Sequence, residues 1–265
     1  MNFLEDQDFA LFVRKVKQWL SIDLSLYKEA QMKRRLTTLR LRKGYATFAA
    51  FFEAMTQNPE LLREFLDRMT INVSEFWRNP NRWELLERKF LPEMLARGRR
   101  LKCWSAACST GEEPYTLAMI LAELGALSDA QIIATDIDEG ALAKAKEAVY
   151  PERLARDVPP RYRDKYLLWS DGQFTVAGAL KKAVSFHRHN LLEDRFQENF
   201  DLIICRNVMI YFTEEAKQQL YHKFARALKT GGVLFVGSTE QIFSPWQYGL
   251  ESAETFFYRK TAKEV

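Results

Sequence analysis

The stretch WSAACSTGEEPYTLA, residues 104–118, decides how this chain folds. It reads as a buried strand that enters a tight turn and continues as a helix, the junction that nucleotide-binding α/β folds place beside their ligand. Such junctions normally carry several glycines, because a phosphate must approach the backbone closely. Here Gly111 is the only glycine, and Glu112 and Glu113 follow it. Two carboxylates would repel a phosphate, so the turn favours a cationic ligand without one, such as S-adenosylmethionine.

Strands alternate with helices around this junction. Apolar runs with the length and composition of buried strands lie at 101–107, 131–138, 200–207 and 233–238, and helical patterns separate them. This alternation predicts a parallel sheet covered by helices, with residues 255–260 as an added edge strand. The expected fold class is α/β, with a Rossmann-like sheet.

Two parts of the chain fall outside this alternation. Residues 1 to about 70 have apolar side chains at helical spacing only, which predicts an all-helical N-terminal domain at 1–75. Residues 76–265 then form the sheet domain. Within it, residues 151–185 are polar and contain prolines, and the run 172–186 reads as a short hairpin. We therefore expect a small inserted β-subdomain at about 151–185.

The composition excludes several classes of protein. The 265 residues are 47% hydrophobic, and 39 basic against 35 acidic residues leave a net charge of +4, too little for a general polyanion binder. Three cysteines without a CxxC pair favour reduced thiols in the cytoplasm. The N-terminus lacks the apolar core of a signal peptide, and no apolar run reaches membrane-spanning length. The three histidines lack metal-ligand spacing, so we expect no metal.

The carboxyl ends of the predicted strands mark the expected ligand site. The opening stretch ends there, as do 134–138, 189–192 and 205–207. Asp136 closes its strand, and a carboxylate there can accept hydrogen bonds from both hydroxyls of a ribose. A glycine at a turn or an aspartate that caps a helix is common by itself. Both in this order favour a nucleoside cofactor.

Six segments together resemble the CheR family of chemotaxis receptor methyltransferases. They are TINVSEFWRN (70–79), SAACSTGEEPYTLA (105–118), ATDID (134–138), HNLL (189–192), CRNVMIYF (205–212) and GSTEQIF (237–243). The resemblance implies a protein-glutamate O-methyltransferase, which esterifies glutamate side chains of chemoreceptors with a methyl group from S-adenosylmethionine and leaves S-adenosylhomocysteine. An RNA or small-molecule methyltransferase on the same fold, and a non-catalytic adaptor that senses the cofactor, are the alternatives.

The resemblance also implies which residues bind the cofactor, with Asp136 at the ribose. The implied set is Asn72, Ser74, Arg78, Glu113, Asp136, Asn190, Leu191, Arg206 and Asn207. Glu112 reads better as an acid that the helix dipole favours in a first turn, and it is left out. Leu191 could equally be a core residue, and Arg78 and Arg206 could form surface ion pairs.

Arg78 and Tyr211 are the candidates for a catalytic role. A glutamate carboxylate is already ionised at pH 7, so methyl transfer needs alignment and desolvation and no general base. Arg78 could hold the substrate carboxylate by charge-assisted hydrogen bonds, and Tyr211 could face the sulfonium. Tyr211 lies in the apolar run VMIYF, so a plain core tyrosine is an equal alternative.

The segment KEAQMKRRLTTLRLRK, residues 28–43, carries seven basic residues and one acidic residue. On a helix, Met32, Leu36 and Leu39 form a buried stripe, and a basic outer face remains. That face consists of Lys33, Arg34, Arg35, Arg40 and Arg42. A solvated surface, docking on acidic receptor helices and binding of RNA phosphates all fit such a face. The resemblance favours the receptor, and no aromatic residues alternate with the basic ones, as single-stranded RNA binding would require. We expect a monomer that neither binds nucleic acid nor inserts into a membrane.

Overall fold

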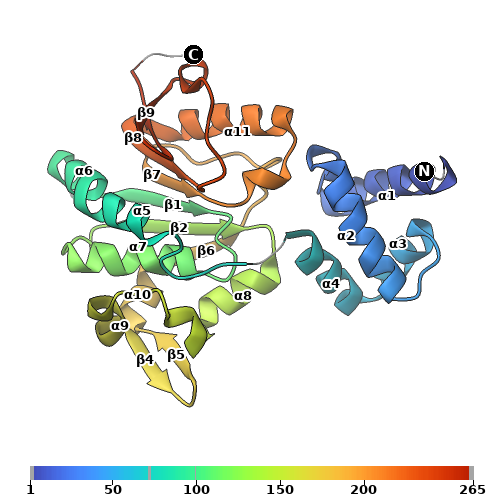
Figure 1. The fold of residues 1–265 in the computed structure, drawn as a ribbon, viewed down its shortest axis with the longest axis horizontal. Coiled ribbons are helices and arrows are strands. Elements are labelled where there is room, and N and C mark those ends of the chain that lie inside the picture. Colours follow the sequence, from blue (N-terminus) through green and yellow to red (C-terminus); the bar gives the residue numbers. More distant parts are fainter. Residues whose placement is uncertain (1–2, 71–72, 99, 263–265) are drawn as a thin grey trace. The chain divides into compact units, whose positions relative to one another are not determined.

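The chain forms two compact units. The computed structural model describes residues 3–70, 73–98 and 100–262 (Figure 1). Unit 1 comprises residues 1–72, 190–195 and 211–220. Unit 2 comprises residues 73–189, 196–210 and 221–265. The predicted division of the chain at residue 75 stays a prediction, since unit 1 also takes two short segments from later in the chain.

Unit 1 is built from helices. They are α1 (Phe3–Leu20), the 3₁₀ turn η1 (Leu24–Leu26), α2 (Glu29–Arg42), α3 (Phe48–Gln57) and α4 (Pro59–Thr70). Two of them begin at side-chain caps: Thr47 accepts a hydrogen bond from the Ala50 N–H, and Asn58 accepts from Glu60 and Leu61. The Asn58 cap separates α3 from α4 at Asn58-Pro59.

The core of unit 1 is aromatic. Phe12 is 1% exposed, and the rings of five phenylalanines have their centroids within 6.3 Å of its own. They are Phe9, Phe48, Phe51, Phe52 and Phe65. Such pairs stabilise a core beyond the area they bury, by about 0.5–1.5 kcal/mol each. Unit 1 therefore has a hydrophobic core of its own.

Backbone hydrogen bonds hold the later segments within unit 1. The Lys28 N–H donates to the Tyr211 carbonyl at 2.9 Å, and the Thr213 N–H donates to the Leu26 carbonyl at 2.9 Å. The amide of Asn190 donates to the Ser21 carbonyl at 3.0 Å. These contacts join residues 21–28, between α1 and α2, to two short segments from the second half of the chain.

Unit 2 contains a seven-stranded sheet. In spatial order its strands are β6 (Val184–Arg188), β2 (Gln131–Asp136), β1 (Lys102–Ala106), β7 (Phe200–Cys205), β8 (Leu228–Val236), β10 (Phe257–Lys260) and β9 (Leu250–Glu254). The first five are parallel, and β10 and β9 are antiparallel. The predicted strand at 255–260 is therefore not at the edge, because the unpredicted β9 pairs with its outer side.

Helices precede and separate these strands in unit 2 (Figure 1). They are α5 (Pro80–Leu85), the π-helix η2 (Leu86–Phe90), α6 (Leu91–Arg97), α7 (Glu112–Glu123), α8 (Glu139–Glu147), α9 (Pro160–Tyr166), α10 (Gly178–Ala183) and the second half of α11 (Glu214–Ala227), with short 3₁₀ turns η3 (Glu152–Ala155), η4 (Met209–Tyr211) and η5 (Pro245–Tyr248). Tyr211 at the end of η4 and residues 214–220 of α11 belong to unit 1. The order of strands and helices confirms the Rossmann-like α/β class.

A small second sheet also belongs to unit 2. Its spatial order is β3 (Val149–Pro151), β5 (Gln173–Val176) and β4 (Leu167–Ser170), and all its pairings are antiparallel. The hairpin expected at 172–186 is wrong: β4 and β5 form the hairpin through Asp171-Gly172, and α10 follows β5. The insertion does form a β-subdomain, between β2 and β6 of the large sheet.

Candidate active site

The turn after β1 is shaped by its backbone. Ala107, Ser109 and Gly111 all have positive φ, and Gly111 reaches +94° as the residue before α7. A Cβ on Gly111 would lie 2.9 Å from the Cβ of Ala145. The single glycine of the opening stretch is thus required by close packing on α8, whatever ligand the turn faces.

Asp136 ties this turn to the end of β2. Its Oδ2 accepts a hydrogen bond from the Ser109 N–H at 2.8 Å, and its Oδ1 accepts from the Asp138 N–H at 3.0 Å. The residue is 6% exposed, and burial raises its pKa. Two donors hold the carboxylate in a fixed orientation at the carboxyl end of the strand, as a ribose-binding residue requires.

Glu113 and Arg206 form an ion pair beneath the turn. The Glu113 Oε2 lies 3.6 Å from Nη1 of Arg206, and the Ser105 hydroxyl donates to Oε1 at 2.8 Å. Burial raises the pKa of Glu113 to about 7, against the opposing effects of Arg206 and Ser105. The Glu113 side chain remains 12% exposed and that of Arg206 only 3%. A ligand can therefore reach Glu113 more readily than Arg206.

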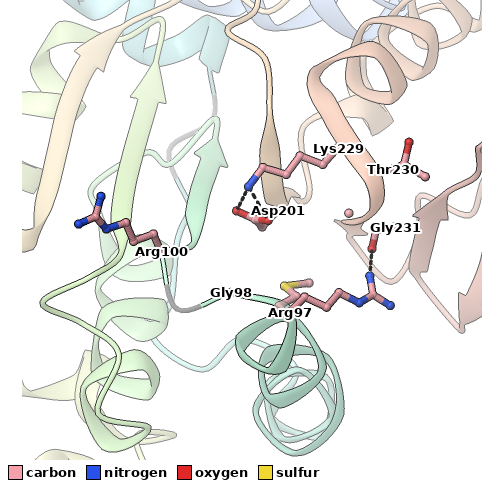
Figure 2. A pocket seen from close by; sticks show the side chains of 9 residues that line it. Arg97, Gly98, Arg100, Asp201, Lys229, Thr230 and Gly231 are labelled. Atoms are coloured by element: carbon pink, nitrogen blue, oxygen red, sulfur yellow. Dashed lines mark hydrogen bonds and ion pairs between the residues drawn. The ribbon is translucent and has the colours of Figure 1, made fainter.

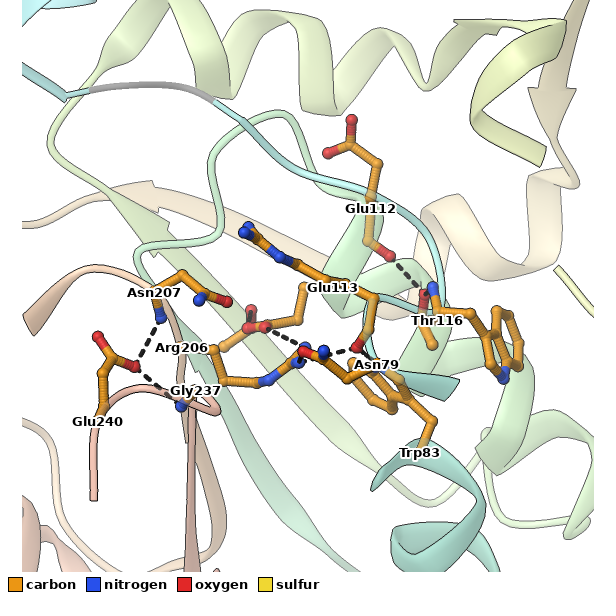
Figure 3. A network of polar contacts seen from close by, with 12 residues as sticks. Asn79, Trp83, Glu112, Glu113, Thr116, Arg206, Asn207, Gly237 and Glu240 are labelled. Carbon is orange, nitrogen blue, oxygen red and sulfur yellow. Dashed lines mark hydrogen bonds and ion pairs between the residues drawn. The ribbon is translucent and has the colours of Figure 1, made fainter. Parts of the chain in front are cut away.

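Arg206 joins the segment 78–79 to the end of β7 (Figure 3). Its Nη2 donates to the Arg78 carbonyl at 2.8 Å and to Oδ1 of Asn79 at 2.7 Å. Its guanidinium lies over the ring of Phe235, 4.7 Å from the centroid. Arg206 is thus a buried residue that orders the backbone, and the surface ion pair is excluded as its role. Arg78 is half-buried, and its Nη1 donates to the Val73 carbonyl at 3.2 Å.

Glu240 is a member of this network that the sequence reasoning missed. Its Oε2 accepts from the N–H groups of Asn207 and Gly237 at 2.7 and 2.8 Å, and its Oε1 accepts from Ile210 at 3.3 Å. It is 5% exposed, and burial raises its pKa. Figure 3 shows the carboxylate bridging the two loops. The signal was present in GSTEQIF, which contains a carboxylate among small residues just after a strand.

Glu112 is buried as well. It is 2% exposed, and its carboxylate accepts from the Thr110 hydroxyl at 2.8 Å. Ser74, a predicted cofactor residue, also hydrogen-bonds to it. Burial raises the pKa of Glu112, so the carboxylate is more than an exposed acid at the start of α7. The Ser74 side chain thus contacts Glu112, and its predicted role in cofactor binding stays a prediction.

These groups give the site an excess of buried negative charge. We call Glu112, Glu113, Asp136 and Glu240 the carboxylate cluster; the Glu113 side chain is 12% exposed and the other three residues are buried. Among the described residues of unit 2, Arg206 is the only buried basic residue, and it pairs with Glu113, while the Glu112 carboxylate points away from it (Figure 3). Coulomb repulsion from Glu240 adds to the effect of burial on the pKa of Glu113, so members of the cluster influence one another. Buried charge needs a partner, which makes a cationic ligand the natural complement.

The remaining predicted site residues belong to unit 1. Asn190 is 5% exposed and Leu191 7% exposed, and the Asn190 side chain contacts Ser21 and the Leu192 N–H. Tyr211 is half-buried, and the guanidinium of Arg35 lies 5.0 Å from its ring centroid. Asn72 lies outside the described residues. The roles of all these residues in cofactor binding and catalysis stay predictions.

The basic outer face of α2 is smaller than expected. Arg40 is 4% exposed; its Nη1 donates to the carbonyls of Tyr45 and Ala46, and its guanidinium stacks on Phe48. Its place on the outer face is therefore wrong, because residue 40 follows Leu36 by four positions and shares its buried stripe. Lys33 pairs with Asp6 and Arg42 with Glu64, and Arg34 is fully on the surface.

A separate hollow lies at the amino ends of β7 and β8. It measures about 240 Å³ and is lined by Arg97, Arg100, Asp201, Lys229 and Gly231, among others. Figure 2 shows Lys229 bound to Asp201 and Arg97 bound to the Gly231 carbonyl. No predicted site residue lines it, and cofactors of this fold bind at the opposite ends of the strands.

The described ranges contain no group of three side chains suited to hold a metal ion. In the same part of the chain, no helix is both long and apolar enough to cross a bilayer. Cys103, Cys108 and Cys205 are buried free thiols.

Two family models match the chain. Residues 7–70 match the model described as CheR methyltransferase, all-alpha domain, and residues 72–256 match CheR methyltransferase, SAM binding domain. The boundary between the two models falls close to the end of α4.

Curated relatives match over nearly their whole length. The chain is 44% identical over 257 residues to the chemotaxis protein methyltransferase of Listeria monocytogenes, covering 97% of this chain and 98% of the relative. It is 35% identical to that of Borreliella burgdorferi, over 91% of this chain and 90% of the relative. For chemotaxis protein methyltransferase 1 of Pseudomonas aeruginosa the identity is 33%, over 89% and 90%. These matches confirm the resemblance carried by the six segments.

Proposed function

We propose that this chain, which belongs to the CheR methyltransferase family, transfers a methyl group from S-adenosylmethionine to glutamate side chains of chemoreceptors. Membership of the family makes it an S-adenosylmethionine-dependent methyltransferase of chemotaxis. The choice of receptor glutamates as acceptors rests on the family and on the chemistry of the site.

The observation that carries this proposal is the charge of the carboxylate cluster. S-adenosylmethionine has an ammonium group and a sulfonium and no phosphate. Three buried carboxylates and the slightly exposed Glu113, which pairs with the buried guanidinium of Arg206, fit such a ligand and would repel a nucleotide phosphate. In this proposal Asp136 holds the ribose, and Glu113 and Asn207 face the methionine part.

The reaction consumes charge, and this sets the tasks of the protein. The bound donor supplies a methyl group on a positively charged sulfur. The acceptor carboxylate is already ionised near pH 7, so the chain has to align and desolvate it. Burial lowers the pKa of Arg206 against the opposing charge of Glu113, and the nearby charge of Arg78 lowers it further. Arg78 therefore lies near the site, and its half-buried guanidinium can bind an incoming carboxylate.

We also propose how the enzyme meets its substrate. The exposed Arg34 and the half-buried Arg35 of α2 would attract acidic receptor helices. Within unit 1, Arg35 lies over the ring of Tyr211, which links the basic helix to a predicted catalytic residue. The enzyme acts as a cytoplasmic monomer in this proposal. It requires no nucleic acid.

Transfer of a labelled methyl group tests the proposal. The chain is incubated with methyl-labelled S-adenosylmethionine and either a chemoreceptor cytoplasmic domain or RNA of similar mass. We expect label on the receptor and none on the RNA. Label on RNA alone would contradict the proposal. Measurable cofactor binding without transfer to either would identify a cofactor-sensing adaptor instead.

A further inference from the structure

The loop between β8 and β9 presents two aromatic side chains to solvent. We call residues 237–249 the aromatic loop. Phe243 is 79% exposed and Trp246 is 70% exposed, more than any other large hydrophobic residue among those described. Large aromatic side chains are rarely left in water without a partner, and they are the residue types that contribute most to protein interfaces.

The aromatic loop is held rigidly at its start. Glu240 fixes it to the Asn207 backbone and to Gly237. A Cβ on Gly237 would lie 2.5 Å from the Glu240 carboxylate, so this position is packed tightly. Two residues later, Ile242 is 3% exposed, and its N–H donates to the Tyr258 hydroxyl at 2.8 Å. Phe243 therefore projects from a fixed buried neighbour.

The far end of the loop is held as firmly. Residues 245–248 form the 3₁₀ turn η5, and the Gly249 N–H donates to the Trp246 carbonyl at 3.2 Å. Tyr248 is 8% exposed, and its ring packs 5.1 Å from Tyr221 and 5.0 Å from His222. Both aromatic side chains are thus presented by an ordered backbone, which lowers the entropy lost when a partner binds.

The exposed surface of the aromatic loop carries no charge, which is compatible with an acidic substrate helix. Glu240 is the only charged residue among residues 237–249, and it is buried, so the exposed surface of the loop is uncharged. The same carboxylate anchors the loop to Asn207, next to Arg206, and Arg78 lies near enough to Arg206 to influence its pKa by charge, in addition to burial. A substrate carboxylate bound at Arg78 would be repelled by acidic side chains on the surface of the loop, and the aromatic loop exposes none.

We infer that Phe243 and Trp246 dock apolar side chains of the receptor helix that carries the acceptor glutamate. This inference rests on the proposed function, because a protein substrate must cover the rim of the site to bring its carboxylate to the donor. The loop is continuous with that rim through Glu240. In this inference Arg78 binds the acceptor glutamate, and Phe243 and Trp246 contact apolar residues of the same receptor helix.

The test compares receptor binding with cofactor binding. Initial rates of methylation are measured against receptor concentration at saturating S-adenosylmethionine for wild type and the double variant Phe243→Ala/Trp246→Ala. We expect the KM for the receptor to rise about tenfold, as for loss of an interface anchor, while the Kd for S-adenosylmethionine is unchanged. Leu11→Ala, which removes an exposed apolar side chain from α1, should change neither. Trp246→Phe should retain most of the receptor affinity.

Several results would overturn the inference. An unchanged KM for the receptor in the double variant would show that the aromatic pair does not meet the substrate. Loss of S-adenosylmethionine affinity in the same variant would assign the pair to the architecture of the cofactor site. Sedimentation of wild type, but not the variant, with vesicles of phosphatidylcholine and phosphatidylglycerol would assign it to lipid. If wild type itself does not methylate the receptor in the same assay, the proposed function is wrong, and this result is distinct from any effect of the variant.

Discussion

Glu113 shows how one carboxyl can respond to the cofactor. Burial raises its pKa to about 7, while Arg206 and Ser105 favour its ionised form. A neighbouring cationic ligand would favour the ionised form further. Binding of S-adenosylmethionine should therefore release a proton near neutral pH, because the free enzyme is partly protonated there and the complex is not.

This coupling gives the first prediction. The ionised carboxyl binds the cation, so affinity for S-adenosylmethionine should rise with pH and level off above about 7. Below that pH, affinity should fall by up to about tenfold per pH unit. Calorimetry in two buffers of different ionisation enthalpy measures both the Kd and the proton release.

A pair of variants separates Glu113 from its neighbour. Glu113→Gln should lower the affinity and abolish the pH dependence near 7, because the titrating group is gone. Glu112→Gln is the matched control: it lies one residue earlier, bound to Thr110, and should leave that pH dependence in place. A wild-type affinity that is flat between pH 6 and 8 would contradict the assignment of Glu113 as a ligand residue.

Among the elements, β7 and β8 pair directly, and the Glu240 side chain joins the loops that follow them. Glu240 accepts backbone hydrogen bonds from the loops after both strands, and Asn207 has a φ of 61° within the first of them. A glutamine at this position has only one acceptor oxygen and would turn its amide toward N–H donors. Leaving a buried N–H unsatisfied costs about 1–3 kcal/mol.

Glu240→Gln should therefore weaken S-adenosylmethionine binding by about tenfold or more, since 1.4 kcal/mol is tenfold in affinity. The reason is displacement of the Asn207 segment, which is predicted to face the methionine part. Measured Kd values and thermal unfolding together check this. If the variant unfolds at the wild-type temperature and binds the cofactor normally, Glu240 does not position the site.

Helix α2 illustrates the difference between surface and buried charge. Arg34 is exposed, whereas Arg40 is buried and hydrogen-bonds the carbonyl groups of Tyr45 and Ala46. Arg34→Glu should weaken receptor methylation at low salt and leave stability unchanged, because exposed charges act through screened electrostatics. Methylation rates measured across a series of salt concentrations check this. The exposed Arg63→Glu on α4 reverses the same charge and is the control.

Arg40→Ala should instead destabilise the protein by about 2 kcal/mol, because the carbonyls of Tyr45 and Ala46 lose their donor. Urea unfolding measures this free energy. Equal stability of the variant and wild type would mean that water replaces the guanidinium at no cost.

For the exposed position, an Arg34→Glu enzyme whose methylation rate and salt dependence match those of the wild type would show that the basic face is only solvated.

For the molecule as a whole, periodic patterns predicted more than single side chains did. The runs at 101–107, 131–138 and 200–207 became β1, β2 and β7, because buried parallel strands are continuously apolar. The position of 255–260 inside the sheet could not be predicted, since β9 has no apolar run by which it could be recognised as a strand. Chain order does not specify which strand lies at an edge.

The site was predictable to the extent that it depends on local motifs. Asp136, Glu113 and Arg206 follow strands or open a helix; the structure pairs Glu113 with Arg206 and ties Asp136 to the turn before α7. Glu240 was missed although it stands among small residues just after a strand, because the backbone groups of Asn207 and Ile210 that it binds lie far away in the sequence. Arg40 was misplaced because its charge suggested the outer face, although it lies on the same stripe as Leu36 and is buried through hydrogen bonds to the carbonyls of Tyr45 and Ala46.

The alkali stability of the bond formed on the receptor distinguishes methylation of glutamate from every other methyl transfer considered above. After incubation with methyl-labelled S-adenosylmethionine, the labelled receptor cytoplasmic domain is isolated and treated with mild alkali, and volatile label is measured. A carboxyl methyl ester hydrolyses to methanol, so the account predicts that nearly all receptor label becomes volatile and that Glu113→Gln enzyme incorporates far less. Receptor label that stays bound through alkali would mean methylation of nitrogen or sulfur, and it would contradict a site built to esterify glutamate.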